Sequence, residues 1–259
     1  MLPVKLVAVL LSVMSVMLVW AVGAAPVRAE TVNCTAITAL PAVITVQGLY
    51  CFTGHLATNI VSGDAIDIQT NNVVVDLNGF KLGGLAAGPG TTANGIHALD
   101  RQNITIKNGT VRGFLKGILL ESTGTSQGHV VEDVRADQNT LTGMEVDGAG
   151  NIVRNNQVVA TGGTTTLGAN ASAQGIMILG NGARVLNNDV INTVKQGTGT
   201  AIGIHFNGAT SSFAVNNRIT VADFGIDCTS GATGKYRDTL TFGVTTPATG
   251  TCTDAGNNN

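Results

Sequence analysis

The sequence has few charged and few aromatic residues. Charged residues make up 12% of the 259 residues and aromatic residues 4%, with one tryptophan and five prolines, whereas a typical soluble domain has about 25% charged residues. Lysine and arginine number 14 against 16 aspartates and glutamates. The chain therefore has no basic excess with which to bind phosphates, and this argues against a nucleic-acid partner. The shortage of aromatic side chains also removes the usual platforms on which sugars stack.

The abundant residue types favour strands and bends rather than helices. There are 34 glycines, close to twice the average share of about 7%, and asparagine is also frequent. Both residues are poor in helix interiors. A hydrophobic fraction of 44% is sufficient for a buried core and argues against disorder. We therefore predict an all-β protein.

The first 29 residues have the features of an export signal. Lys5 precedes an apolar run over residues 6–25, and Val27-Arg28-Ala29 offers small residues at the two positions that a signal peptidase recognises. The run is long enough to span a bilayer, so an uncleaved anchor is the competing interpretation. Pro26 and the cleavage-type site favour cleavage. We predict a signal peptide over 1–29 and a secreted or periplasmic protein with no membrane association after cleavage.

The four cysteines agree with export. Cys34 and Cys51 lie near the start of the mature chain, Cys228 and Cys252 lie near its end, and none lies between them. Four cysteines allow three pairings. The local pairing, Cys34 with Cys51 and Cys228 with Cys252, would clamp chain ends that otherwise fray. No Cys-x-x-Cys pair or Cys/His cluster is present, so the cysteines are not predicted to bind a metal.

A repeated unit organises most of the chain. A small residue followed by an aliphatic one recurs at intervals of 22 to 32 residues, at Ala65-Ile66, Gly95-Ile96, Gly117-Ile118, Gly143-Met144, Gly175-Ile176, Gly203-Ile204 and Gly225-Ile226. A polar turn and a second alternating stretch follow, and three of these stretches end in an asparagine pair, at 155–156, 187–188 and 216–217. Asparagine tolerates left-handed backbone and suits a sharp bend. One unit is therefore strand, turn, strand, bend, strand and variable loop, and such units bury their apolar faces by stacking.

Two segments carry a resemblance to a known family. Residues 72–79 (NVVVDLNG) and 103–109 (NITIKNG), with the Gly-Ile and Asn-Asn units, resemble right-handed parallel β-helix proteins of the pectate-lyase-like superfamily. The resemblance covers roughly residues 63–244 and implies a right-handed, three-sided parallel β-helix, here of about seven coils with disulfide-closed ends. It also implies that the asparagine bends separate the second and third sheets and stack as a ladder inside the helix. We predict a cap over 30–62, the β-helix over 63–245 and a tail or cap over 246–259.

Strand alternation converts the repeats into a map of one face. The residue after each aliphatic points outward, which gives a first column of Asp67, His97, Leu119, Glu145, Met177, His205 and Asp227. A second column two residues further on contains Gln69, Leu99, Glu121, Asp147, Leu179, Asn207 and Thr229. Neighbouring coils are about 4.8 Å apart, so we expect Asp67 beside His97, His205 beside Asp227, and a mid-face cluster of carboxylates. The candidate catalytic residues are Asp67, His97, Glu121, Glu145, Asp147, His205 and Asp227.

These residue types suit proton transfer. A carboxylate beside an imidazole can raise its pKa and fix its tautomer. Packed carboxylates can share a proton or bind Ca²⁺, so the cofactor stays open: calcium is compatible with the sequence and not required by it. By resemblance, the Gly-Ile strands correspond to the first sheet, which carries the polysaccharide cleft in pectate lyases and polygalacturonases. The resemblance therefore implies a polysaccharide or glycan partner.

Other features argue for a plainer interpretation. Outward positions of any solvated sheet are polar. Leucines and a methionine interrupt the two columns, which is less polar than an acid–base site requires, although a loop such as 161–173 could cover these apolar residues. The catalytic motifs of the related enzymes are missing, among them the Asn-Thr-Asp of polygalacturonases and the Arg-x-Pro-x-x-Arg of pectate lyases. His55 and His129 lie outside the columns and are expected to be structural or solvated. Three hypotheses remain: an exported polysaccharide lyase or hydrolase, a non-catalytic glycan-binding module, and a structural or adhesive module. We expect a monomer.

Overall fold

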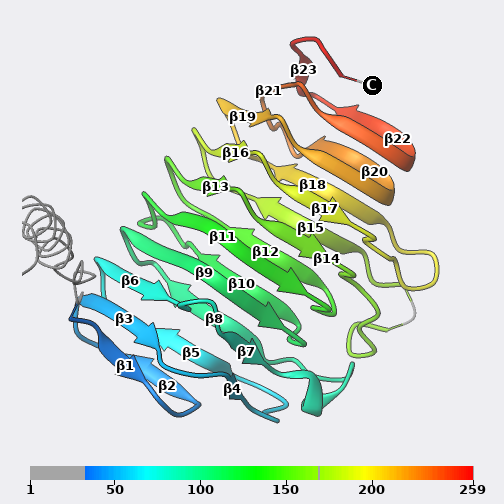
Figure 1. Ribbon diagram of the computed structural model, residues 1–259. Helices are drawn as coiled ribbons and strands as arrows, with labels where there is room; N and C mark the ends of the chain where they lie inside the picture. The colour runs from blue at the N-terminus through cyan, green and yellow to red at the C-terminus, as the bar shows by residue number, and fades with distance from the viewer. Residues whose placement is uncertain (1–32, 169, 259) are drawn as a thin grey trace, which may run out of the picture. The chain divides into compact units, whose positions relative to one another are not determined.

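The structure is a computed structural model that describes residues 33–168 and 170–258, so the predicted signal peptide lies outside the described residues. The described chain forms 23 strands and one turn of 3-10 helix, η1 (Leu85–Ala87), with no α-helix. Each strand pairs in parallel with a strand of a neighbouring coil, and Figure 1 shows the coils stacked in order from β1 to β23. None of the described residues forms a helix of the length and hydropathy needed to cross a membrane.

The parallel pairs form three sheets. The first contains β2 (Ala42–Ile44), β5 (Asp64–Ile68), β8 (Asn94–Leu99), β10 (Lys116–Glu121), β12 (Thr142–Val146), β15 (Ala173–Ile178), β18 (Ala201–Asn207) and the second parts of β20 (Arg218–Thr229) and β22 (Leu240–Gly250). The second contains β1 (Thr35–Ile37), β3 (Gly48–Phe52), β6 (Val73–Asp76), the first parts of β9 (Ile104–Arg112) and β11 (Val130–Asp137), β13 (Ile152–Arg154), β16 (Arg184–Leu186), β19 (Ser212–Val215), β21 (Gly234–Arg237) and β23 (Thr253–Asp254). The third contains β4 (Leu56–Ala57), β7 (Lys81–Gly83), the second parts of β9 and β11, β14 (Gln157–Val159), β17 (Asp189–Ile191) and the first parts of β20 and β22.

This arrangement confirms the predicted right-handed, three-sided parallel β-helix. It has about eight turns, close to the predicted count of about seven. The small difference arises because the outermost first-sheet strands lack the Gly-Ile signature. The register of β2 on β5 and of β22 on β20 places Pro41 and Pro247 where inner coils have a small residue or glycine. Proline has no N–H to give to a sheet and is tolerated on edge strands, so it suits these two outer coils.

The repeated glycine is required by close approach between coils. A Cβ atom at Gly95 would lie 2.4 Å from the carbonyl oxygen of Gly117, and one at Gly175 would lie 2.6 Å from that of Gly203. The aliphatic residue that follows is fully buried, as at Ile96. Two successive residues of each unit therefore point into the core, and this breaks the strand alternation at one fixed place.

The asparagine bends form the ladder that the resemblance implied. Asn156, Asn188 and Asn217 are buried, and the side-chain amide of each of the first two donates to the carbonyl oxygen of the next at 3.0 Å. The preceding asparagine of each pair has left-handed backbone, as at Asn155 with φ of 55°. The ladder runs between the second and third sheets and satisfies the backbone groups at the bend.

A second internal ladder lies at the turn between the first and second sheets. The backbone N–H of Ile104 donates to Nδ1 of His129 at 3.2 Å, and the N–H of His129 donates to Oδ1 of Asn151 at 2.8 Å. Further along, the N–H of Ala183 donates to Oγ of Ser212. Because different residue types form the rungs, the sequence repeat does not reveal this ladder. His129 is 1% exposed, and its role is structural.

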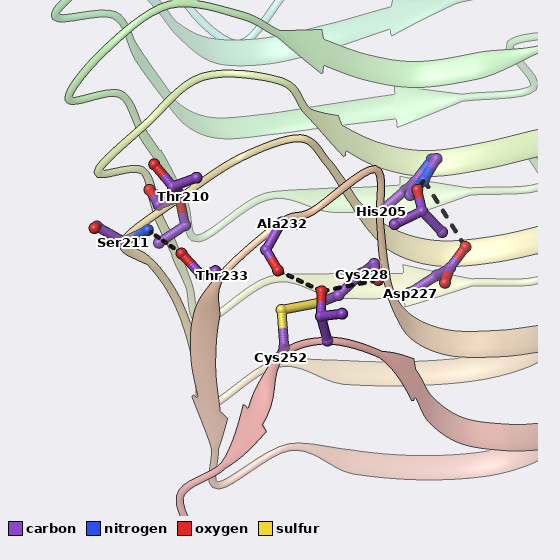
Figure 2. The surroundings of a disulfide bond; sticks show 11 residues. His205, Thr210, Ser211, Asp227, Cys228, Ala232, Thr233 and Cys252 are labelled. Atoms are coloured by element: carbon purple, nitrogen blue, oxygen red, sulfur yellow. Dashed lines mark hydrogen bonds and ion pairs between the residues drawn. A yellow bond between two sulfur atoms is a disulfide. The ribbon is translucent and has the colours of Figure 1, made fainter.

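The disulfides join Cys34 to Cys51 and Cys228 to Cys252, which confirms the local pairing. The first holds the segment before β1 to the second sheet, and the second ties the end of β20 to the segment before β23. Figure 2 shows the second disulfide, between Cys228 and Cys252. The hydroxyl of Thr251, the residue before Cys252, donates to the carbonyl oxygen of Ala232. Both disulfides lie near the ends of the stack, where coils have a neighbour on one side only.

Candidate functional site

The residues of the first predicted column lie in register on the first sheet. Asp67 pairs with His97, and the column continues through Leu119, Glu145, Met177, His205 and Asp227. Their contacts nevertheless divide them into separate groups along the stack, and these groups differ in exposure and in charge.

The most accessible group surrounds His97. Nδ1 of His97 lies 3.0 Å from Oδ2 of Asp64 and 3.9 Å from Oδ1 of Asp67, and Nε2 lies 3.3 Å from Oε2 of Glu121. We call these four residues the His97 cluster. Three carboxylates from β5 and β10 thus surround one imidazole on β8. The side chain of His97 is 17% exposed and that of Glu121 is 46% exposed, so the cluster is open to a ligand.

The charges within the His97 cluster stabilise one another. The hydrogen bond to Asp64 raises the pKa of His97 above its usual value, against the opposing effect of burial, and Glu121 and Asp67 add to the rise. Burial alone would raise the pKa of Asp64, but hydrogen bonds with His97 and Asn94 outweigh it and hold that pKa below its usual value. An ionised Asp64 beside a protonated imidazole is therefore favoured.

Sequence reasoning missed Asp64, although the repeat contains the signal. Ala65 and Ile66 are both fully buried, so the outward residue before Asp67 stands three positions earlier rather than two. In register with Asp64 are Asn94 and then Lys116. The Gly-Ile units thus define a third outward column, and it supplies both an acid and a lysine to the face.

The mid-face carboxylates make separate contacts rather than one cluster. Nζ of Lys116 lies 2.8 Å from Oε2 of Glu145, whose side chain is 11% exposed, whereas Glu121 turns to His97. Asp147 accepts a hydrogen bond from the N–H of Gly148 at 2.5 Å. Its pKa is raised, mainly by burial and in smaller part by the negative charge of Glu121. The N–H of Asp147 donates to the carbonyl oxygen of Leu120 at 2.8 Å, so Asp147 and Glu121 lie on neighbouring coils.

The third group, His205 and Asp227, is nearly closed to solvent. Nε2 of His205 lies 2.9 Å from Oγ1 of Thr229 and 3.8 Å from Oδ2 of Asp227 (Figure 2). Both His205 and Asp227 are 8% exposed. Burial lowers the pKa of His205 and raises that of Asp227, and the attraction between them offsets this only in part. His205 lies four coil spacings from His97, a distance of about 19 Å along the stack.

His55 and the long loop before β15 lie outside the two predicted columns. His55 accepts a hydrogen bond from the N–H of Lys81 at 3.1 Å and packs edge-on against Phe80, away from the first sheet. The N–H of Thr165, in the long loop before β15, donates to the carbonyl oxygen of Pro89, in the segment before β8, at 3.1 Å. This loop therefore reaches back along the edge where the first-sheet strands begin, towards the strand that carries His97.

Comparison with solved structures shows the fold. The chain is similar to an alginate lyase from Paenibacillus sp. str. FPU-7, with a TM-score of 0.52 and 14% identity over 82% of this chain and 86% of that one. Tailspike protein 2 of Escherichia coli O157:H7 bacteriophage CAB120 gives a TM-score of 0.47 and 12% identity over 86% of this chain and 38% of that one. At 14% identity the likeness to the alginate lyase establishes the parallel β-helix and nothing more. No protein-family model matches the sequence, and no curated protein matches it.

Proposed function

We propose that the chain acts on a polysaccharide through the first-sheet face, with the His97 cluster and Asp147 as its reactive centre. The observation that carries this proposal is the arrangement of three carboxylates around one accessible imidazole on the outward face of the first sheet. Such a face suits an extended sugar chain lying along the stack. The likeness to an alginate lyase supports the substrate class by analogy of fold alone.

Glu121 and Asp147 are the two groups best placed for acid–base work. Glu121 is the most exposed member of the His97 cluster, and its bond to Nε2 of His97 orients it, because Asp64 holds the other ring nitrogen. Asp147, one coil away, has a raised pKa. A carboxyl group with a raised pKa can act as proton donor while a neighbouring carboxylate acts as acceptor. We assign Asp147 as donor and Glu121 as acceptor, in either a lyase or a hydrolase reaction.

The other predicted residues have supporting roles in this proposal. Asp67 and His97 position Glu121, whereas Glu145 and the His205–Asp227 pair line the face further along the stack. Disulfides persist in oxidising compartments, so the two disulfides support a secreted or periplasmic location. We propose that the mature chain works as a monomer.

The test is a screen of the purified chain on neutral and uronic-acid polysaccharides, following both reducing ends and unsaturated products. We expect Glu121→Gln to reduce turnover by at least ~100-fold, the lower range for loss of a general base. Glu132→Gln is the matched control, because Glu132 lies on the second sheet and pairs with Arg154. Full activity in both Glu121→Gln and Asp147→Asn would refute the assignment.

A non-catalytic glycan-binding module is the second candidate. The observation that favours it is the engagement of Glu145 with Lys116 and the burial of His205 and Asp227, which leaves few free groups beyond the His97 cluster. Retention of the chain in a gel containing the polysaccharide, with no product released, would support the binding module over the enzyme.

A further inference from the structure

We propose that Asp64, Asp67 and His97 bind a divalent transition-metal cation, and that zinc fits their donor set best. Each offers one ligand atom, and these three atoms lie within 4.8 Å of one another. Zinc binds nitrogen and oxygen ligands at about 2.0–2.2 Å, which sets neighbouring ligand atoms roughly 3.3 Å apart in a tetrahedron. Nδ1 of His97 is already 3.0 Å from Asp64 and 3.9 Å from Asp67, so small side-chain movements complete the geometry.

Groups outside the three ligands hold them in the required orientation. The side-chain amide of Asn94 donates to Oδ1 of Asp64 at 2.8 Å, and that of Gln69 donates to Oδ2 of Asp67 at 2.7 Å. Each carboxylate therefore has one oxygen fixed by an amide and turns the other towards Nδ1. On the far side of the ring, Nε2 faces Glu121. A histidine that binds a metal through one nitrogen commonly donates its other N–H to a carboxylate, and Glu121 meets this requirement.

The charge balance of the His97 cluster also calls for a cation. Three carboxylates surround one imidazole, and within residues 33–168 and 170–258 no lysine or arginine forms an ion pair with any of them. The neighbouring Lys116 is instead paired with Glu145. A dication bound between Nδ1 of His97 and the two aspartates would neutralise carboxylates that no lysine or arginine of the described chain reaches, while the contact from Nε2 to Glu121 stays in place.

The donor set favours zinc over calcium. Calcium takes six to eight oxygen ligands, whereas one imidazole nitrogen with two carboxylates suits zinc and its neighbours in the transition series. Three protein ligands would leave a fourth position open, as in zinc sites that also bind water or substrate. The open position would lie on the exposed side of the first sheet. This inference rests on the geometry of the three side chains and does not depend on activity towards glycans.

The experiment measures zinc binding directly, by titration calorimetry and by equilibrium dialysis with metal analysis, on the mature chain without a histidine tag. We expect one zinc per chain, and a calcium affinity that is lower. Loss of a residue that only hydrogen-bonds a metal ligand typically weakens metal binding by ~10–100-fold, and we expect a loss in this range for Gln69→Ala. His97→Gln and Asp67→Asn each remove a proposed ligand and should weaken zinc binding by more than this. His205→Gln is the matched control and should bind zinc as the wild type does.

Three results would overturn the proposal: no zinc bound, zinc binding that survives both His97→Gln and Asp67→Asn, or calcium binding tighter than zinc. Thermal unfolding of each variant shows that it is folded, and the conservative Asp67→Asn, at a partly exposed position, keeps the test valid if His97→Gln is unstable. The zinc titration contains no glycan, so its result is independent of the proposed function. A chain without activity on polysaccharides can still bind zinc, and a chain with that activity can still fail to bind it.

Discussion

Lowering the pH from 7 to 5 tests the ladder residue His129. The N–H of Ile104 donates to Nδ1 of His129, so Nδ1 carries no proton and Nε2–H donates to Oγ of Ser126 at 2.6 Å. A second proton would have to bind Nδ1, where it would face another N–H in a buried site. Burial lowers the pKa of His129 to about 4. The folded protein therefore keeps this ring neutral at pH 5.

The sign and size of the effect follow from the two pKa values. In the unfolded chain the ring titrates near 6.5, so below that pH the unfolded state binds a proton that the folded state does not. The free energy of unfolding must then fall as the pH falls from about 6.5 towards 4. One pKa unit corresponds to about 1.4 kcal/mol. Between pH 7 and pH 5, His129 alone should lower the free energy of unfolding by about 2 kcal/mol.

The assay is urea unfolding of the wild type and of His129→Asn at pH 7, 6 and 5, with both disulfides intact. Asparagine cannot titrate in this range, and the next rung of the same ladder is Asn151. Subtracting one protein from the other removes the contributions of all other groups. The stability advantage of the wild type should shrink by about 2 kcal/mol between pH 7 and pH 5. Parallel pH profiles for the two proteins would show that His129 is not held neutral and would refute the reasoning.

Two further predictions concern the stack itself. Asn188→Ala should lower the free energy of unfolding by about 4 kcal/mol, because the Asn188 side chain makes four buried hydrogen bonds worth about 1 kcal/mol each. The measurement is urea unfolding, with Asn187→Ala at the neighbouring exposed position as the control. Equal losses of stability in the two variants would contradict the ladder. Gly143→Ala should lower the free energy of unfolding by about 1–3 kcal/mol through overpacking. The added Cβ would lie 2.5 Å from a methyl group of Val158 and 2.6 Å from a carbonyl oxygen of the next coil. An unchanged midpoint of thermal unfolding would contradict this prediction.

The repeat predicted the register because it combines two constraints that few folds share. A glycine is needed where coils approach closely, and a left-handed asparagine is needed where the chain bends between two sheets. Both constraints recur once per coil, so their positions align the outward residues, as the pairing of His205 with Asp227 shows. The outermost coils escaped detection because proline replaces the glycine there. The ladder through His129 could not be predicted from the repeat, because its rungs are different residue types that have in common only a side-chain hydrogen-bond acceptor.

The side-chain contacts of the site could not be predicted in the same way, because they depend on rotamers and not on register. Glu145 and Glu121 occupy predicted outward positions, yet one turns to Lys116 and the other to His97. Strict alternation also places the wrong residue before Asp67, since it assigns Ala65 to the outward face. That error concerns the most consequential contact of the face, the one between Asp64 and His97.

The close packing of the coils and the convergence of Asp64 and Asp67 on His97 have one structural cause. The small residue of the repeat lets adjacent backbones approach, and it can do so only if it points into the core together with the aliphatic that follows. The outward residues on either side of this inward pair are then Asp64 and Asp67. Asp64 and Asp67 flank the same inward pair on β5, so both side chains project from the outward face of the first sheet. His97, at the outward position of the neighbouring strand β8, therefore contacts two carboxylates of β5 instead of one.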